Sequence, residues 1–269
     1  MENVTIIVPH RHGIEPERNR FPQGTLFIDD EGKGKKYALQ KGITAAQTEY
    51  VWLTDDDVQF PESIQLPDLS GSPDLIILPL RMKKGHSLLE RLQQTEFAAI
   101  QSLTLWTAER GRAVMCSGAN LIVNRKQWLE SITDLRPDLP SGDDMFLLES
   151  FKRRGLRIKC ATTPALEIAP VAGLRQLLRQ RMRWAGKAPH YTDNDIRLCG
   201  ALVLCINLLV WLPPVFIAKY IVDCLLIRAA QRFGTTVRNY GWYAFLLSLV
   251  YPVYMLICLI GGLFRMHKW

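Results

Sequence analysis

A short strand that ends in three consecutive aspartates constrains this chain more than any other stretch of its sequence. Residues 50–54 are aromatic, β-branched or apolar, as expected of a buried strand. Asp55, Asp56 and Asp57 follow it directly. Adjacent carboxylates repel one another, so they need either water or a nearby cation. Ligands of open α/β sheets bind beyond the carboxyl ends of the strands, where oxygen ligands suit Mg²⁺ or Mn²⁺ and its bound phosphates. A solvated acidic turn is the alternative interpretation of this triplet.

The composition indicates a basic protein with a membrane portion. The 269 residues carry a formal charge of +7, yet 48% of them are hydrophobic. Two runs without a charged side chain, residues 198–218 and 242–264, are each long enough to span a bilayer. Pro213 and Pro214 interrupt the first run, which predicts a kink or a re-entrant break. The six cysteines form no CxxC pair, so neither a disulfide framework nor a zinc site is expected.

Two membrane topologies are open. A strand-like segment at residues 4–8 replaces a signal peptide, so we expect the amino-terminal part to stay in the cytosol. Two crossings would then place Arg228, Arg232 and Arg238 outside, against the positive-inside tendency. If the first run instead dips into the membrane and returns, these arginines stay inside and only the second run crosses.

The rest of the chain alternates strand and helix patterns, which predicts an α/β fold. Strands are expected at residues 4–8, 25–28, 50–54, 74–80 and 121–123, and helices at 37–46, 87–106, 145–152 and 174–187. Prolines bracket residues 15–22, so we expect no full crossover helix between the first two strands. The helix at 174–187 interleaves leucine with arginine. It could lie on an anionic membrane, hold a pyrophosphate or bind nucleic acid, and the apolar runs after it favour the membrane.

Three further segments are candidates for ligand contact, each with an ordinary structural alternative. The turn at residues 32–36 contains glycine and lysine before a helix, and such turns either cradle phosphate or simply lie on the surface. Small residues at 116–120 allow close approach to a ligand, or else form a packing turn. Asp143 and Asp144 begin a helix, where the helix dipole favours acids whatever their function.

Taken in order, these segments resemble the membrane-bound family 2 glycosyltransferases over essentially the whole chain. The matching motifs are Gly32-Lys33-Gly34-Lys35-Lys36-Tyr37-Ala38-Leu39, Thr54-Asp55-Asp56-Asp57, Cys116-Ser117-Gly118-Ala119-Asn120, Gly142-Asp143-Asp144 and Gln180-Arg181-Met182-Arg183-Trp184. The last satisfies the Q-x-x-R-W motif of processive and ceramide-glycosylating members. The resemblance implies an α/β GT-A (Rossmann-like) nucleotide-sugar domain at residues 1–190 and a region with transmembrane helices at 191–269.

The resemblance also implies roles for individual residues. Asp55 and Asp57 match the D-x-D motif that holds Mg²⁺ or Mn²⁺ and the sugar diphosphate, and Asp144 matches the inverting general base. The motif that closes over the diphosphate and donor sugar corresponds to Gln180, Arg183 and Trp184. Further donor contacts are expected from Lys33, Lys35 and Asp56, and contact with the uridine side from Asp29 or Asp30.

The expected function is therefore inverting, metal-dependent transfer of a sugar from a nucleotide-diphosphate sugar, expected to be a UDP-sugar, to a lipid or glycan hydroxyl. The resemblance implies an integral membrane protein, in contact with membrane lipids, whose catalytic domain is cytoplasmic, as at a bacterial inner membrane. The chain departs from the family in its amino-terminal lobe, where one strand–helix unit is shortened. This motivates the alternative of a catalytically weakened relative that acts as a scaffold. A nucleic-acid partner is not expected, because acidic clusters repel phosphate.

Overall fold

The computed structural model describes residues 3–136, 138–139 and 141–265, and the described chain forms two compact units. The first contains residues up to Leu80 together with Thr104–Ile168. The second contains Arg81–Leu103 and the chain from Ala169 onward. The predicted domain boundary near residue 190 stays a prediction, although the structure groups the helix at 174–185 with the second unit.

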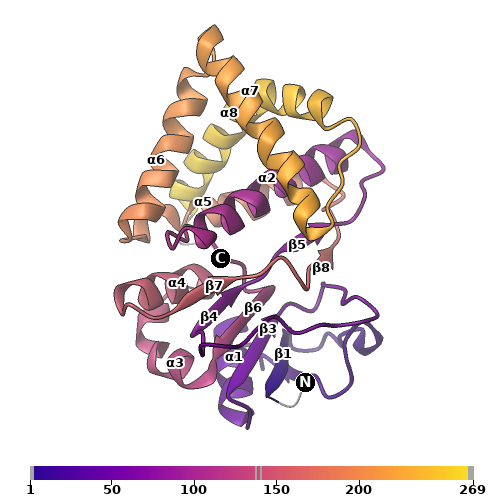
Figure 1. The fold of residues 1–269 in the computed structure, drawn as a ribbon, viewed down its shortest axis with the longest axis vertical. Helices are drawn as coiled ribbons and strands as arrows, with labels where there is room; N and C mark the ends of the chain where they lie inside the picture. The colour runs from indigo at the N-terminus through magenta and orange to yellow at the C-terminus, as the bar shows by residue number, and fades with distance from the viewer. Residues whose placement is uncertain (1–2, 137, 140, 266–269) are drawn as a thin grey trace. The chain divides into compact units, whose positions relative to one another are not determined.

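The first unit is built on a six-stranded mixed sheet with the strand order β2-β1-β3-β6-β4-β7 (Figure 1). Its strands are β1 (Val4–His10), β2 (Leu26–Asp29), β3 (Tyr50–Thr54), β4 (Leu75–Ile77), β6 (Asn120–Asn124) and β7 (Ile158–Cys160). β1 runs parallel to both β2 and β3, whereas β6 is antiparallel to β3 and β4. The carboxyl ends of β1, β2 and β3 therefore meet at one edge of the sheet, where ligands bind in open α/β folds.

Helices of the first unit are α1 (Lys35–Ala45), α3 (Arg125–Glu130) and α4 (Asp143–Arg153), with 3-10 turns η1 (Arg18–Arg20) and η2 (Ile132–Leu135). α1 packs on β1 and β2 through Gly42. A Cβ atom added at Gly42 would lie 2.8 Å from Cγ2 of Ile7 and 2.9 Å from Cγ1 of Ile28. Only glycine lets this helix approach the sheet so closely.

The connection between β1 and β2 contains only the three-residue turn η1. This confirms that no full crossover helix separates these two strands, as the prolines around residues 15–22 predict. The strands nevertheless pair in parallel, with Ile7 opposite Leu26 and His10 opposite Asp29. The short connection therefore keeps the strand ends of this lobe aligned.

One predicted strand is wrong in its extent. Residues 74–80 were expected to form a single strand, but β4 ends at Ile77 and a separate strand, β5 (Leu80–Met82), begins after Pro79. Proline has no backbone N–H group and cannot continue a hydrogen-bonded ladder, so the strand is interrupted there. The last strand among the described residues is β8 (Leu166–Ile168).

The second unit is helical, and α2 (Leu88–Glu109) runs from it into the first unit. Its other helices are α5 (Leu174–Ala185), α6 (Asn194–Leu209), α7 (Pro213–Ala229) and α8 (Tyr240–Arg265), with 3-10 turns η3 (Ala188–His190) and η4 (Ala230–Phe233). α2 begins with a capping box, in which the backbone N–H of Glu90 donates to Ser87 Oγ at 3.2 Å.

Glycines on α8 allow close packing against α5. A Cβ atom at Gly261 would lie 2.7 Å from Cε of Met182, and one at Gly262 would lie 2.6 Å from the carbonyl oxygen of Met182. Such close backbone approach through small residues is typical of helices that associate in membranes. The packing fixes the face of α5 that turns toward α8.

The first uncharged run is not a single membrane-crossing helix. α6 ends at Leu209, and α7 begins at Pro213 with Pro214 next to it, so residues 198–218 are split between two helices. Prolines suit the first turn of a helix, where no intrahelical donor is needed, but they prevent α6 from continuing. The break that Pro213 and Pro214 predict is confirmed, and whether this run crosses the membrane or returns stays a prediction.

The second run is helical throughout. Within the described residues, α8 is the one helix long and apolar enough to cross a bilayer, with a mean hydropathy of 2.2 over its most apolar 18 residues. Only 22% of its most apolar window is buried within the protein. α8 is therefore the candidate for a membrane-spanning segment.

Hydrogen bonds of the buried Asn120 side chain connect strands and loops of the first unit. Asn120 is fully buried on β6 and accepts a hydrogen bond from Nε1 of Trp52 at 2.9 Å. Its Nδ2 donates to the carbonyl oxygens of Pro79 at 2.6 Å and Pro164 at 3.0 Å. All of these groups are buried away from water, so each depends on the amide of Asn120 for its partner.

Replacing Asn120 should therefore destabilise the first unit strongly. We expect Asn120→Ala to lower the free energy of unfolding by about 2–4 kcal/mol, because it leaves buried donors and acceptors unpaired. Asn124→Ala, at the other end of β6, removes the cap of α3 and a hydrogen bond to Tyr50, and it should cost less, about 1 kcal/mol. Thermal unfolding of both variants in detergent tests this, and equal losses would contradict the role given to Asn120.

Candidate active site

The aspartates after β3 lie where a buried strand reaches the surface. All residues of β3 are buried, and the side chain of Thr54 donates to the carbonyl oxygen of Ala119 at 2.9 Å. Asp55 and Asp56 are half-buried, and Asp57 is exposed. The strand end is thus fixed against the loop before β6, and the carboxylates are directed outward at the carboxyl edge of the sheet.

Lys35 is the cation that compensates these carboxylates. It is the first residue of α1, and its Nζ donates to Oδ1 of Asp55. Loss of hydration disfavours the charged ammonium, but the attraction of Asp55, Asp143 and Asp144 outweighs it and raises the pKa of Lys35. Lys35 is therefore charged, as the crowding of the aspartates requires.

Two acids from a distant part of the chain lie near Lys35. Asp143 and Asp144 begin α4, after Gly142 in a left-handed conformation with φ of 95°. A Cβ atom added at Gly118 would lie 3.4 Å from Asp143 Oδ2, 3.5 Å from Lys35 Nζ and 3.6 Å from Asp144 Cβ. Four of the segments singled out in the sequence therefore converge. We call Asp55, Asp143 and Asp144 the acid cluster, with Lys35 as its counter-ion.

The two acids of α4 differ in their surroundings. Asp144 is half-buried, and its carboxylate accepts from the backbone N–H groups of Gly118 at 3.3 Å and Met145 at 2.8 Å. Asp143 is 8% exposed. Burial first, and then the charges of Asp144 and Asp55, raise the pKa of Asp143 even though Lys35 acts in the opposite direction. Asp144 is thus held in a fixed orientation and remains accessible, whereas Asp143 is enclosed.

The loop that leads into α4 is tied to α1 by another lysine. Nζ of Lys36 donates to the carbonyl oxygens of Leu135 at 2.6 Å, Arg136 at 2.6 Å and Leu139 at 2.7 Å. An ammonium group has three donors, and here each has a carbonyl partner. Lys36 therefore positions the segment before α4, while its neighbour Lys35 turns to the acid cluster.

The excess of negative charge at the end of β3 fits a divalent cation. Partial loss of hydration and then repulsion by Asp55 raise the pKa of Asp56. The pKa of Asp57 is raised by the same two effects, with repulsion from both Asp55 and Asp56. Among the described residues, no three His, Cys, Asp or Glu side chains are already arranged to hold a metal ion. Magnesium-like ions commonly take only one or two protein carboxylates and complete their shell with substrate phosphates and water. The oxygen donors of Asp55 and Asp57 match that requirement.

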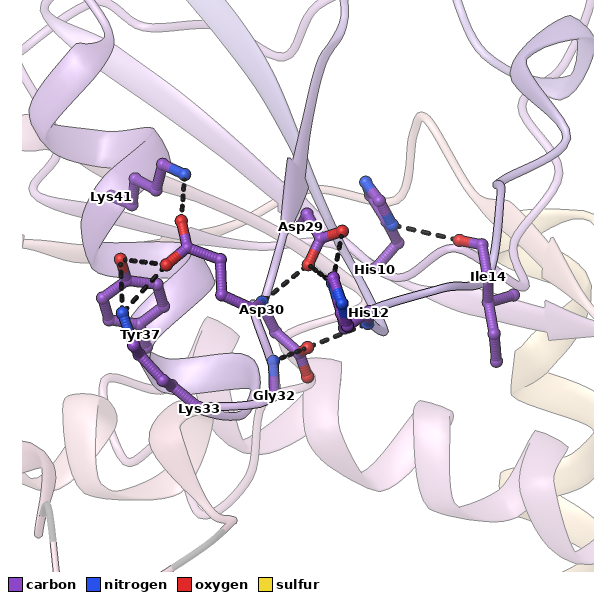
Figure 2. A network of polar contacts seen from close by, with 10 residues as sticks. His10, His12, Ile14, Asp29, Asp30, Gly32, Lys33, Tyr37 and Lys41 are labelled. Carbon is purple, nitrogen blue, oxygen red and sulfur yellow. Dashed lines mark hydrogen bonds and ion pairs between the residues drawn. The ribbon is translucent and has the colours of Figure 1, made fainter.

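Asp29 and Asp30, at the end of β2, form a second polar network (Figure 2). Oδ1 of Asp29 accepts from the backbone N–H of Glu31 at 2.6 Å and lies 3.1 Å from Nδ1 of His12. Oδ1 of Asp30 accepts from the backbone N–H groups of His12 and Gly32, both at 2.9 Å. These backbone contacts are the main reason why the pKa of each aspartate is lowered. Both carboxylates thus hold the loops at the ends of β1 and β2, a role that the sequence does not reveal.

Lys33 does not join the acid cluster. Its Nζ donates to Glu31 Oε2 at 2.8 Å and lies 4.3 Å from the ring centre of Tyr37 (Figure 2). Hydrogen bonds from Lys33, Lys41 and Tyr37 lower the pKa of Glu31 to about 2. The structure therefore separates the two lysines expected at the donor: Lys35 faces the acid cluster, and Lys33 does not.

In the second unit, the structure divides the Q-x-x-R-W segment of α5 into a buried and an exposed part. Gln180 is half-buried, and Arg183 and Trp184 are exposed. Arg181, which the motif leaves unspecified, is buried and donates to Glu96 at 2.7 Å and to the hydroxyl of Tyr254 at 3.1 Å.

Sequence reasoning missed Arg181 and Glu96 as a pair. The guanidinium of Arg181 also lies 4.1 Å from the ring centre of Trp184, so one residue links the three helices α2, α5 and α8 within the second unit. The available signal was Glu96, an acid in the middle of the helix expected at 87–106, and Glu96 occupies a buried position of α2. Gln180, Arg183 and Trp184 as donor contacts stay predictions.

Breaking this pair should destabilise the second unit. We expect Arg181→Gln to lower its stability by about 3–5 kcal/mol, because Glu96 would remain as a buried charge without a cation. Arg183→Gln, two residues further along the same helix, should change stability by less than about 0.5 kcal/mol because Arg183 is exposed. Thermal unfolding of the two variants in detergent provides the measurement. A similar effect of both substitutions would show that the pair does not anchor α5.

Comparisons with known proteins identify a protein family and solved structures to which the chain is similar. Residues 19–187 match the protein family described as "Glycosyltransferase like family 2". No curated protein matches the chain significantly in sequence. Among solved structures, the mannosyltransferase PcManGT from Pyrobaculum calidifontis, in complex with GDP-Man and Mn²⁺, is similar over 99% of this chain and 87% of its own. Its sequence identity is 16% and its TM-score is 0.53.

Two further structures are more distant. Glucosyl-3-phosphoglycerate synthase from Mycobacterium tuberculosis, in complex with Mn²⁺ and UDP-glucose, covers 71% of this chain and 80% of its own, with 13% identity and a TM-score of 0.40. S. aureus TarS matches 94% of this chain and 90% of its own, with 13% identity and a TM-score of 0.38. At these identities, structural likeness shows the fold alone. The similarity to PcManGT confirms the expected α/β GT-A-like mixed sheet with a Rossmann-like core.

Proposed function

Because the chain belongs to the glycosyltransferase like family 2, we propose that it transfers a sugar, with inversion, from a nucleotide-diphosphate sugar to an acceptor hydroxyl at a membrane. One observation carries this proposal. Lys35, Asp55, Gly118 and Asp144, from four separate segments, converge at the carboxyl edge of the sheet. A cation, a half-buried carboxylate with fixed orientation and an excess of oxygen ligands are the groups that displacement of a diphosphate needs.

We propose Asp55 and Asp57 as the residues that would hold a divalent ion. Mn²⁺ is the ion we favour, because PcManGT, which shares this fold, was solved with GDP-Man and Mn²⁺. A bound divalent ion would supply charge stabilisation for the departing diphosphate. Asp56 lies between the two ligands in sequence and stays a proposed donor contact, as do Lys33, Asp29 and Asp30. A UDP-sugar remains our predicted donor.

Asp144 is the residue we assign as general base. Backbone N–H groups of Gly118 and Met145 fix its carboxylate, and its half-buried position leaves it within reach of an acceptor hydroxyl. It would take the proton of that hydroxyl as the oxygen attacks the sugar carbon. Asp143 lies in the same first turn of α4, so the helix dipole favours its charge equally, but its side chain is buried. It is therefore the weaker candidate.

The membrane location is supported by apolar side chains exposed on the helices of the second unit. Exposed large hydrophobic residues follow α6, α7 and α8; they include Leu202, Leu209, Ile217, Ile221, Leu225, Val250, Val253, Ile257 and Ile260. Soluble proteins rarely expose so many large apolar side chains on neighbouring elements. We therefore propose that these helices contact lipid, and that the acceptor is reached at the membrane surface.

Substituting the two acids of α4 separately tests the proposed chemistry. Asp144→Asn should lower turnover by about two to four powers of ten, as expected for the loss of a positioned base. Donor affinity should change little, because the base acts on the acceptor hydroxyl. Asp143→Asn serves as the matched control and should cost less turnover. Transfer rates and donor affinities of both variants are to be measured with a set of lipid and glycan acceptors.

Near-normal turnover of Asp144→Asn, or a loss confined to donor affinity, would contradict the assignment of the base. If the unaltered protein binds donor but transfers no sugar to any acceptor, the alternative of a catalytically weakened binding partner is favoured. The short connection between β1 and β2 is the structural feature that motivates this alternative.

Charges placed on α8 test the lipid contact. We expect Val253→Arg with Ile257→Arg to weaken retention in membranes, since each arginine costs roughly 2.5–3.5 kcal/mol near the centre of a spanning helix. The conservative pair Val253→Ile with Ile257→Val should remain in the membrane after salt and alkaline carbonate washes. Release of the unaltered protein by a salt wash alone would contradict the proposed membrane location.

A further inference from the structure

Lys35 occupies the position in the acid cluster where positive charge is most needed. Its Nζ is bonded to Oδ1 of Asp55, one of the two proposed ligands of the divalent ion. A Cβ atom added at Gly118 would lie 3.5 Å from this Nζ and 3.4 Å from Oδ2 of Asp143. The ammonium group therefore stands among carboxylates from β3 and α4, and one of its contacts uses an oxygen that a metal would require.

From this arrangement, and on the basis of the proposed function, we propose that Lys35 and the divalent ion compete for Asp55. Lys35 is then a positioning residue that holds the end of β3 and the start of α4 together until the ion arrives with the donor. The ammonium group of Lys35 would release Asp55 when a divalent ion is bound there. Lys35 thereby lowers the affinity for the ion alone, so that the ion binds tightly only when the diphosphate contributes further oxygens.

Simple electrostatics supports the competition. A divalent ion on Asp55 and Asp57 and an ammonium group on the same Asp55 carboxylate are like charges at short range, and they repel one another. The side chains of Lys35 and Asp55 are 33% and 35% exposed, so both the ion and water can reach this contact. The flexible four-carbon chain of lysine allows the ammonium group to move away while the backbone of α1 stays in place.

The backbone around Lys35 is fixed independently of its ammonium group. Gly42 packs α1 closely on the sheet, and Lys36 binds three carbonyl oxygens of the loop before α4. Removal of the Lys35 charge should therefore leave the fold of α1 intact. The effect to be expected is electrostatic and local to the acid cluster.

The test is the affinity of the full-length protein for Mn²⁺ alone, measured by titration calorimetry in detergent. Lys35→Met should bind Mn²⁺ at least about tenfold more tightly than the unaltered protein, because the competing cation is gone. Lys35→Arg keeps the charge and should stay near the unaltered affinity. Lys41→Met removes a lysine from the same helix that pairs with Glu31 instead, and it should also leave the affinity unchanged.

A second titration with a nucleoside diphosphate present separates the possible failures. Adding the diphosphate should strengthen Mn²⁺ binding less in Lys35→Met than in the unaltered protein. Unchanged or weaker binding of Mn²⁺ alone by Lys35→Met would overturn the competition, and Lys35→Gln provides a second variant should the first fail to fold. If the unaltered protein binds no Mn²⁺ even with the diphosphate, the proposed function itself fails.

Discussion

The crowding of carboxylates at the carboxyl edge of the sheet, balanced by one ammonium group, is the interaction on which the rest of this structure depends. Asp55 cannot lie half-buried near Asp143 and Asp144 without a cation, and Lys35 provides it. The elements around the cluster serve to hold these charges: Gly42 brings α1 onto the sheet, and Thr54 fixes the end of β3. The chemistry of the proposed site follows from the same excess of negative charge.

Much of the fold could be predicted because local patterns and global packing agree. β3, α1 and the start of α4 have clear signals, and the interruption at Pro213 and Pro214 follows from the missing proline donors. The need for a cation near the aspartates was also evident from electrostatics. Which lysine supplies it was not, because Lys33 and Lys35 lie in one turn and only the path of α1 directs Lys35 to the acids.

The features that escaped prediction are contacts between segments far apart in the chain. Asp29 and Asp30 were expected at the donor, yet their carboxylates hold the backbone of neighbouring loops, which propensity and spacing do not reveal. The ion pair of Arg181 with Glu96 joins residues 85 positions apart. A motif specifies which residues recur in a family, but burial decides which of them carry the packing. Within the Q-x-x-R-W segment of α5 the buried residue is Arg181, next to Gln180.

The central claim is that the carboxylates after β3 bind a nucleotide-diphosphate sugar through a divalent ion. Calorimetry of the detergent-solubilised full-length protein with UDP- and GDP-sugars, with and without Mn²⁺, tests it most directly. We expect donor binding that requires Mn²⁺ in the unaltered protein and is lost in Asp57→Asn, while the variant keeps its unfolding temperature. Donor binding with unchanged metal dependence in Asp57→Asn, or no donor binding by the unaltered protein, would contradict it.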